Sequence, residues 1–94
     1  MKNYKLFIGS NNATGKLEKK KILKTALKYC PQGYTYYEGF GVYKSEAMEC
    51  KEKCGIIEVL NKKSVITKLA EELKIVLKQE SILVQEFQTV SKFI

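Results

Sequence analysis

The segment at residues 9–16 (GSNNATGK) has the composition of a loop that could bind an anion. An apolar run precedes it and an amphipathic segment follows it, so the sequence predicts a turn leading from a strand into a helix. Backbone amides at a helix start, together with the helix dipole, hold anions, and a lysine side chain adds a point charge. We therefore predict that this loop binds an anionic ligand through Ser10, Asn11, Asn12, Thr14 and Lys16.

This loop is not a Walker A motif. The spacing between Gly9 and Gly15 is one residue longer than in that motif, and Leu17 stands where a Ser or Thr must bind magnesium. The alternative to an anion site is an ordinary turn in which Thr14 caps the following helix.

The segment 34–43 (YTYYEGFGVY) is aromatic and β-branched, which predicts a strand. A strand alternates its faces, with Tyr34, Tyr36, Phe40 and Val42 on one side and Thr35, Tyr37 and Tyr43 on the other. One side meets the helices, and the other is exposed, binds a ligand or is covered by another subunit. We predict that stacking on a nucleotide base comes from Tyr36, Tyr37, Phe40 and Tyr43. Gly39 and Gly41 indicate a bulge, close helix packing or an approaching ligand or second chain.

The same strand predicts a homo-oligomer, because both of its sides are aromatic. Two-fold symmetry is the commonest arrangement, so a dimer is the default. The expected interface comprises Tyr34, Tyr36, Phe40, Val42 and Ile75, the last of which falls outside the apolar arc of its helix.

The composition excludes several kinds of catalytic and metal site. The chain has no His, Trp, Asp or Arg; its basic residues are 17 Lys and its acidic residues 10 Glu. Ser-His-Asp and Cys-His catalysis, His-containing zinc sites and Asp-rich calcium loops are therefore absent. The odd number and loose spacing of Cys30, Cys50 and Cys54 favour free thiols, with Cys30 in the core. We expect no enzyme, no metal and no cofactor, although Glu38, Glu58 and Glu86 could lie on neighbouring strands.

The net charge of +7 is concentrated in residues 1–30, which hold eight lysines and one glutamate. Five lysines lie on the entry loop and one face of the first helix: Lys16, Lys20, Lys21, Lys24 and Lys28. Such a face attracts an acidic protein surface, nucleic acid or nucleotide phosphates, and the alternative is a well-solvated surface.

The pattern of apolar residues predicts a single domain over 1–94 with the order β-α-β-β-α-β. The expected strands are 4–10, 34–43, 54–60 and 81–93, and the expected helices 17–30 and 65–79, the second capped by Ser64. Residues 44–53 are polar and form either a hairpin connection or an extended arm. Two amphipathic helices need a sheet to cover, so we expect an α+β, ferredoxin-like fold with four antiparallel strands and both helices on one face.

The apolar runs are too short to span a membrane or to form a signal-peptide core, which predicts a cytoplasmic protein. The preference for Lys over Arg is typical of a low-GC genome, so the expected setting is a bacterium or a phage-infected host cell.

Five short segments together resemble a bacterial family of small uncharacterised proteins, a domain of unknown function. They are Leu6-Phe7-Ile8-Gly9; Pro31, Gly33 and Thr35; Glu38-Gly39-Phe40-Gly41 with Tyr43; Glu52-Lys53-Cys54; and Gln79-Glu80-Ser81-Ile82-Leu83-Val84. The resemblance covers most of the chain and implies a ferredoxin-like fold but no activity. This chain departs from the family in having neither Arg nor Trp.

A weaker resemblance is to RNA-recognition motifs. Leu6-Phe7-Ile8-Gly9 is similar to their short signature and Gly39-Phe40-Gly41-Val42-Tyr43 to part of the longer one, which implies binding of single-stranded RNA. Glu38 opposes this, because it replaces the basic residue that opens the longer signature.

Together these observations predict a small, oligomeric, non-catalytic module that binds an anionic, nucleotide-like molecule, such as a phage sequestering or anti-defence protein. The alternatives are a protein–protein inhibitor or adaptor that acts through the lysine-rich first helix, and a single-stranded RNA-binding protein.

Overall fold

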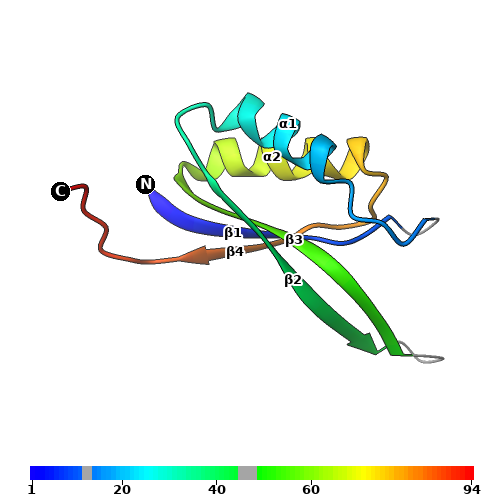
Figure 1. Cartoon of the computed structure of the whole chain (residues 1–94). Helices are drawn as coiled ribbons and strands as arrows, with labels where there is room; N and C mark the ends of the chain where they lie inside the picture. Colours follow the sequence, from blue (N-terminus) through cyan, green and yellow to red (C-terminus); the bar gives the residue numbers. More distant parts are fainter. Residues whose placement is uncertain (12–13, 45–48) are drawn as a thin grey trace.

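A computed structural model describes residues 1–11, 14–44 and 49–94, with the side chains of 43, 44, 49 and 50 left out (Figure 1). Its elements follow the expected order. They are β1 (Lys2–Ile8), α1 (Lys19–Tyr29), β2 (Thr35–Lys44), β3 (Glu49–Asn61), α2 (Lys63–Val76) and β4 (Leu83–Phe87).

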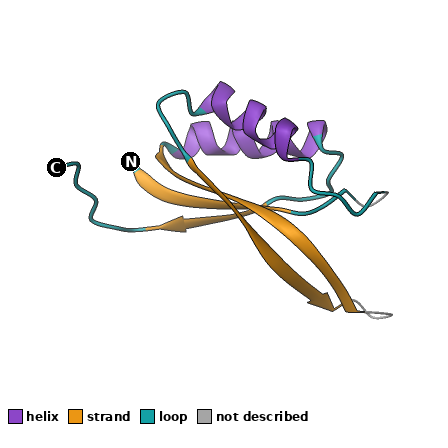
Figure 2. Cartoon of the chain, viewed as in Figure 1, coloured by secondary structure: helices purple, strands orange, loops and turns teal. Residues whose placement is uncertain are grey.

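The four strands form one antiparallel sheet in the order β2-β3-β1-β4. Both helices lie on the same face of this sheet, and the other face is uncovered (Figure 2). The predicted ferredoxin-like α+β fold is therefore confirmed. None of the helices in the described part of the chain is long and apolar enough to cross a bilayer.

The core lies between the sheet and the helices. Alternation along β1 directs Tyr4, Leu6 and Ile8 toward the helices, where they are buried, and leaves the residues between them half-buried on the open face. The helices contribute apolar residues at helical spacing, among them Ile22, Ala26, Ile66, Leu69 and Leu73. Cys30 lies in this core as expected, with 2% of its surface exposed.

Strands β2 and β3 form a long arm that extends past the helices (Figure 1). Their register is unbroken from Thr35 opposite Glu58 to Lys44 opposite Glu49. The third strand was expected to begin at Cys54 but begins at Glu49, so residues 44 and 49–53 extend the arm, and residues 45–48 lie outside the described part. No helix packs on this part of the arm, so its side chains need not be apolar. Polar residues can therefore continue the two strands, which are held together by backbone hydrogen bonds. The bulge considered at Gly39 is also wrong, since the pairing passes through that residue without interruption.

All the predicted element ends differ from the structure by one or more residues, and three differences concern helix caps or the end of the last strand. Helix α1 begins at Lys19 with Glu18 at its N-cap, and α2 begins at Lys63 with Lys62 at its N-cap, so neither Thr14 nor Ser64 caps a helix. Strand β4 ends at Phe87, which lies opposite Asn3 near the start of β1, and not at residue 93 as expected. Residues 88–94 therefore continue without regular structure and are exposed.

Candidate functional site

The end of β1 is a crossing point of three segments that are distant in the sequence. The Nε2 of Gln79, which follows α2, donates to the carbonyl oxygens of Gly9 (2.9 Å) and Ser10 (3.2 Å). On the other side, Ser10 Oγ donates to the carbonyl oxygen of Lys53 in β3 (2.6 Å), and Ser10 is only 1% exposed. The chain turns back toward Gly9 because Lys78 adopts a positive φ of 53° just before Gln79.

The ends of two polar side chains approach Gly9 closely, in the space that a side chain at this position would occupy. A Cβ at Gly9 would lie 2.9 Å from Glu52 Oε1 and 3.4 Å from Gln79 Oε1. Neither of these two acceptors takes a hydrogen bond from the described residues, so the crossing presents a pair of unpartnered oxygens. Glu52 and Gln79 were absent from the predicted ligand-binding set. The sequence feature that could have identified these two residues was the resemblance to the family of uncharacterised bacterial proteins. Its matching segments included 52–54 and 79–84 as well as the end of the first strand.

The loop after Ser10 closes on itself. Asn11 N donates to Lys16 O (2.8 Å), Gly15 N to Asn11 O (2.7 Å) and Thr14 N to Asn11 Oδ1 (3.1 Å). Lys16 N donates to Thr14 Oγ1 (3.2 Å), and Gly15 takes a left-handed φ of 69°. Asn12 lies outside the described residues.

The expected mechanism of anion binding by free amides is therefore wrong for the described loop residues. Their amides are used within the loop, and α1 begins three residues after Lys16 rather than at the loop. What remains for an anion is the exposed side chain of Lys16, with Lys19 and Lys53 as further cations on the neighbouring elements.

The predicted aromatic set divides between the two faces of the sheet. Phe40 lies on the helix side, opposite Lys53 in the β2–β3 pairing and 66% exposed. Tyr36 lies on the same side but is half-buried, whereas Tyr37 is on the open face and donates to Glu58 Oε1 (3.2 Å). The side chain of Tyr43 is outside the described part. Phe40 pairs with Lys53, whose carbonyl oxygen binds Ser10, but its ring lies on the face opposite to Glu52, and Tyr37 lies farther along β2.

Tyr36 packs flat against β3 because Gly55 has no side chain. A Cβ at Gly55 would lie 2.9 Å from the ring carbon Cε1 of Tyr36. The ring carries Lys19 Nζ at 5.9 Å from its centroid, and its hydroxyl donates to Glu38 Oε2 (3.2 Å). Burial, followed by the negative charge of Glu38, raises the pKa of Tyr36 to about 12. Tyr36 is thus a structural contact, and the carboxylate beside it would repel an RNA phosphate.

The predicted oligomer interface is corrected in part. Tyr34 and Tyr36 pack against the core of their own chain, and the Tyr34 hydroxyl donates to the Leu23 carbonyl oxygen in α1 (3.2 Å). Phe40, Val42 and Ile75 are exposed, as an interface requires. The open face adds a row of apolar residues that crosses the sheet from Tyr37 through Ile56 and Phe7 to Leu83.

The positive charge belongs to the helical layer. Residues 15–30 and 62–80 hold eleven lysines and four glutamates, and the rest of the chain holds six of each. Within the predicted electrostatic face, Lys21 pairs with Glu18 (3.2 Å) and Lys28 with Glu72 (2.7 Å). Hydrogen bonds from Lys28 and Tyr29 lower the pKa of Glu72. Lys16, Lys20 and Lys24 are exposed and have no acidic partner among the described residues. Lys19 is also exposed without an acidic partner there, and its ammonium group lies over the Tyr36 ring.

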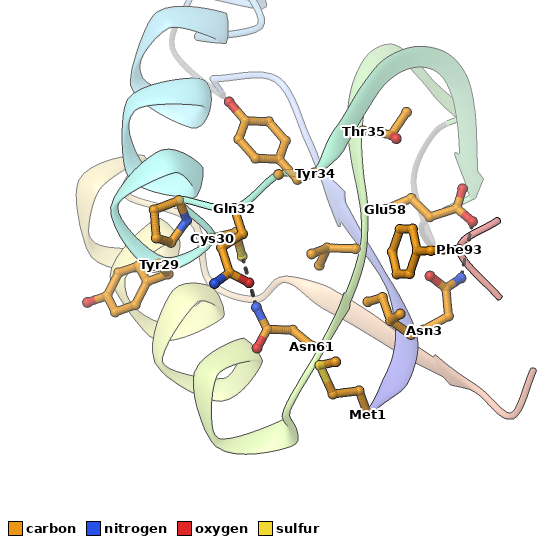
Figure 3. Close-up of a pocket in the computed structure, with 14 residues that line it drawn as sticks. Met1, Asn3, Tyr29, Cys30, Gln32, Tyr34, Thr35, Glu58, Asn61 and Phe93 are labelled. Atoms are coloured by element: carbon orange, nitrogen blue, oxygen red, sulfur yellow. Dashed lines mark hydrogen bonds between the residues drawn. The ribbon is translucent and has the colours of Figure 1, made fainter. Parts of the chain in front are cut away.

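A cavity of about 660 Å³ lies at the other end of β1, beside the C-terminal end of α1 (Figure 3). Asn61 Nδ2 donates to Cys30 Sγ there (3.7 Å), and burial raises the pKa of the Cys30 thiol. None of the predicted ligand-binding residues that the structure describes lines this cavity, and its described lining contains Glu58 but no lysine. It is therefore a poor site for an anion. The described residues contain no cluster of metal-ligating side chains.

No protein-family profile matches the chain, and no curated protein matches it. Solved structures do match. A phage SAM lyase in complex with S-methyl-5'-thioadenosine superposes with a TM-score of 0.71 at 19% identity, covering 90% of this chain and 80% of that one. The divalent cation tolerance protein CutA from Archaeoglobus fulgidus gives 0.68 at 11% identity, covering 99% and 88%. The GlnK–ATP complex of B. subtilis gives 0.54 at 21% identity, covering 93% and 84%.

These similarities establish a shared fold, because all three identities are low. The resemblance to a family of uncharacterised bacterial proteins stays a prediction in the absence of a matching profile. The chain is a small ferredoxin-like α+β protein of the same architecture as CutA, GlnK and the phage SAM lyase.

Proposed function

We propose that this protein is a non-catalytic module that binds an adenine nucleoside or nucleotide at the end of β1. The observation that carries the proposal is the pair of unpartnered acceptors, Glu52 Oε1 and Gln79 Oε1, held beside Gly9. Ribose hydroxyls and an exocyclic amino group are hydrogen-bond donors, and this pair offers them acceptors in a fixed place. Phe40 is exposed on the helix side of the arm, the face opposite to Glu52, so stacking on its ring is not part of the proposal.

Lysine side chains around this crossing could bind the phosphate groups of a nucleotide. Lys53 lies next to Phe40 in the sheet, and Lys16 and Lys19 come from the loop and the start of α1. Lysines bind phosphate as point charges without a fixed geometry, so the recognition would lie in the nucleoside part and the cations would add affinity.

Two structural neighbours support this ligand class. One neighbour is in complex with S-methyl-5'-thioadenosine and another with ATP, and both ligands contain adenosine. In a phage-infected bacterium, a module that holds such a molecule without converting it would sequester a signal of host defence.

The proposal includes a homo-oligomer. The open face exposes Tyr37 and Leu83 around the apolar Phe7 and Ile56, and Phe40 and Val42 are exposed on the arm. Contiguous apolar surface of this kind marks an interaction site in a soluble protein.

The test is isothermal titration calorimetry of the oligomer as purified, with ATP, AMP, adenosine, S-methyl-5'-thioadenosine and GTP. We expect adenine ligands to bind and the Gln79→Ala variant to lose about tenfold in affinity, since a lost hydrogen bond costs about 1–1.5 kcal/mol. The Gln32→Ala variant, changed at an exposed glutamine beside the cavity at the other end of β1, is the matched control and should bind normally.

Two results would contradict the proposal. Heats that do not exceed those of ionic-strength controls for every ligand would exclude the site. Chromatography of the ligands, extended to S-adenosylmethionine, should recover them unchanged, and formation of a product would show an enzyme instead.

A second candidate function is docking of the lysine-rich face of α1 on an acidic protein surface. It is favoured by Lys20 and Lys24, which are exposed and have no acidic partner in the described part of the chain. The double variant Lys20→Glu with Lys24→Glu should abolish capture of such a partner while leaving nucleoside binding intact. Retained capture would exclude this face.

A further inference from the structure

Strand β4 leaves one edge of the sheet open, with a groove beside it. In the sheet order, β4 pairs with β1 on one side only. Helix α2 overhangs this edge and encloses a groove of about 380 Å³. Ile66 and Ala70 of α2 face Ile82 and Val84 across the groove, and Glu71 and Lys74 lie on its rim. An open edge with an apolar groove is a template for an added strand.

Residues 88–94 (QTVSKFI) follow β4 directly and carry apolar side chains with nothing to cover them. Val90, Phe93 and Ile94 are almost completely exposed. The segment runs away from the body of the molecule, beyond the start of β1 (Figure 1). It contains neither Pro nor Gly, so its composition allows it to continue as a strand.

We propose that two copies of this chain dimerise by pairing these strands, so that the 88–94 segment of each copy lies along β4 of the other. The two-fold axis passes through the Gln88 pair, and the strands run antiparallel. In this register Val90 lies opposite Glu86, Lys92 opposite Val84 and Phe93 opposite Leu83. The two four-stranded sheets then form one continuous sheet across an isologous interface.

The alternation of side chains fits this register on both faces. Within β4, Val84 and Glu86 lie on the helix side with Leu6 and Tyr4, and Leu83 lies on the open face with Phe7. Continuing the alternation places Val90, Lys92 and Ile94 on the helix side. Val90 and Ile94 therefore enter the groove of the partner, and Phe93 covers the partner's Leu83, which is 57% exposed in the single chain.

The charges are complementary as well. Lys92 makes no ion pair with any described residue, and the same holds for Glu71 on the rim of the groove. With Lys92 above Val84, its ammonium group reaches toward Glu71 of α2 across the groove. The partner is thus recognised by three apolar contacts and one ion pair, each repeated by symmetry.

A segment folding back on its own β4 is the competing arrangement. It would need a two-residue turn at Gln88 and Thr89, which lacks the Gly, Asn or Asp that such turns require. It would also reverse the alternation, moving Val90 and Ile94 to the open face.

The decisive experiment is disulfide trapping of the full chain. In a Cys50→Ser background, Cys30 and Cys54 are buried. A Gln88→Cys substitution should give a disulfide-linked dimer under mild oxidation, because the two residues meet at the axis, about 5 Å apart. The matched control Ser91→Cys is equally exposed but lies roughly 20 Å from its mate in this register, so it should stay unlinked. Equal linking of both variants, or linking of neither, would overturn the proposal.

Charge reversal provides a second measurement, at two exposed residues whose substitution leaves the core unchanged. Lys92→Glu or Glu71→Lys alone should weaken dimerisation about tenfold in sedimentation, since symmetry repeats each lost pair, and the double variant should restore it. A double variant as weak as the singles would refute the contact. Because neither residue is at the β1 end, nucleoside titration of the same variants separates failure of this interface from failure of the proposed function.

Discussion

Replacing Gly55 by alanine tests whether the flat packing of Tyr36 on β3 fixes the arm. The new Cβ would lie 2.9 Å from Cε1, 3.0 Å from the hydroxyl oxygen and 3.4 Å from Cζ of the Tyr36 ring. A planar ring cannot yield as a flexible chain end can, so the whole side chain must leave β3. Overpacking of this kind costs about 1–3 kcal/mol, offset by about 0.4–1 kcal/mol from the lower chain entropy of alanine when unfolded.

The net expected loss is about 1–2 kcal/mol, or roughly 5–15 °C in Tm for a domain of this size. The assay is thermal and urea unfolding at fixed protein concentration, because oligomerisation makes Tm depend on concentration. The control is Gly39→Ala, whose Cβ would meet the flexible Cδ1 of Ile56 at 3.2 Å and should cost less.

A double-mutant cycle isolates the contact. In a Tyr36→Ala background the Gly55→Ala substitution has no ring to displace, so it should be neutral or slightly stabilising. An equal loss of stability in both backgrounds would show that the alanine disturbs the β2–β3 pairing itself, and the reasoning would fail.

Three other outcomes are expected. Ultraviolet titration should show Tyr36 ionising near pH 12, and stability should fall between pH 10 and 12 because the unfolded chain releases this proton before the folded chain. The pKa values of Tyr4 and Tyr29 are raised as well, so Tyr36→Phe should reduce that fall without removing it, and an unchanged slope would contradict the assignment. Hydrogen bonds from Tyr4 and Lys2 lower the pKa of Glu86. The free energy that Glu86 adds to folding is therefore present above the ordinary carboxyl pKa and is lost as the pH falls through the lowered pKa. In urea unfolding, the Glu86→Gln variant should lack this loss of stability in acid. Gln79→Ala should reduce unfolding free energy by about 1–2 kcal/mol through two lost hydrogen bonds, measured by urea denaturation, and a change below 0.5 kcal/mol, roughly the error of such data, would show that water replaces the amide.

The fold was predictable because its signals are local. Alternation in β1 and helical spacing in α1 and α2 mark which side chains face the core, and only one compact arrangement buries all of them. Element ends were less predictable, since a polar strand such as the start of β3 is stabilised by pairing with β2 rather than by its own residues.

The candidate site was predictable only in outline. The loop was identified from its glycine and asparagine residues, whereas Glu52 and Gln79 had no chemical pattern to separate them from other polar residues. Their role depends on meeting at Gly9, which is a property of three chain segments together. The loop amides were misassigned because a short loop can satisfy its own donors, and composition does not show whether it does.

The sequence by itself determined the class of fold, the absence of histidine, arginine and aspartate chemistry, and the excess of lysine. These follow from residue types and their period along the chain. The tertiary structure decided which acceptors meet at the β1 end, which face of the sheet stays open, and that the whole net charge lies on the helical layer. Those features arise from contacts between residues far apart in the chain, where the geometry of packing, and not local preference, sets the distances.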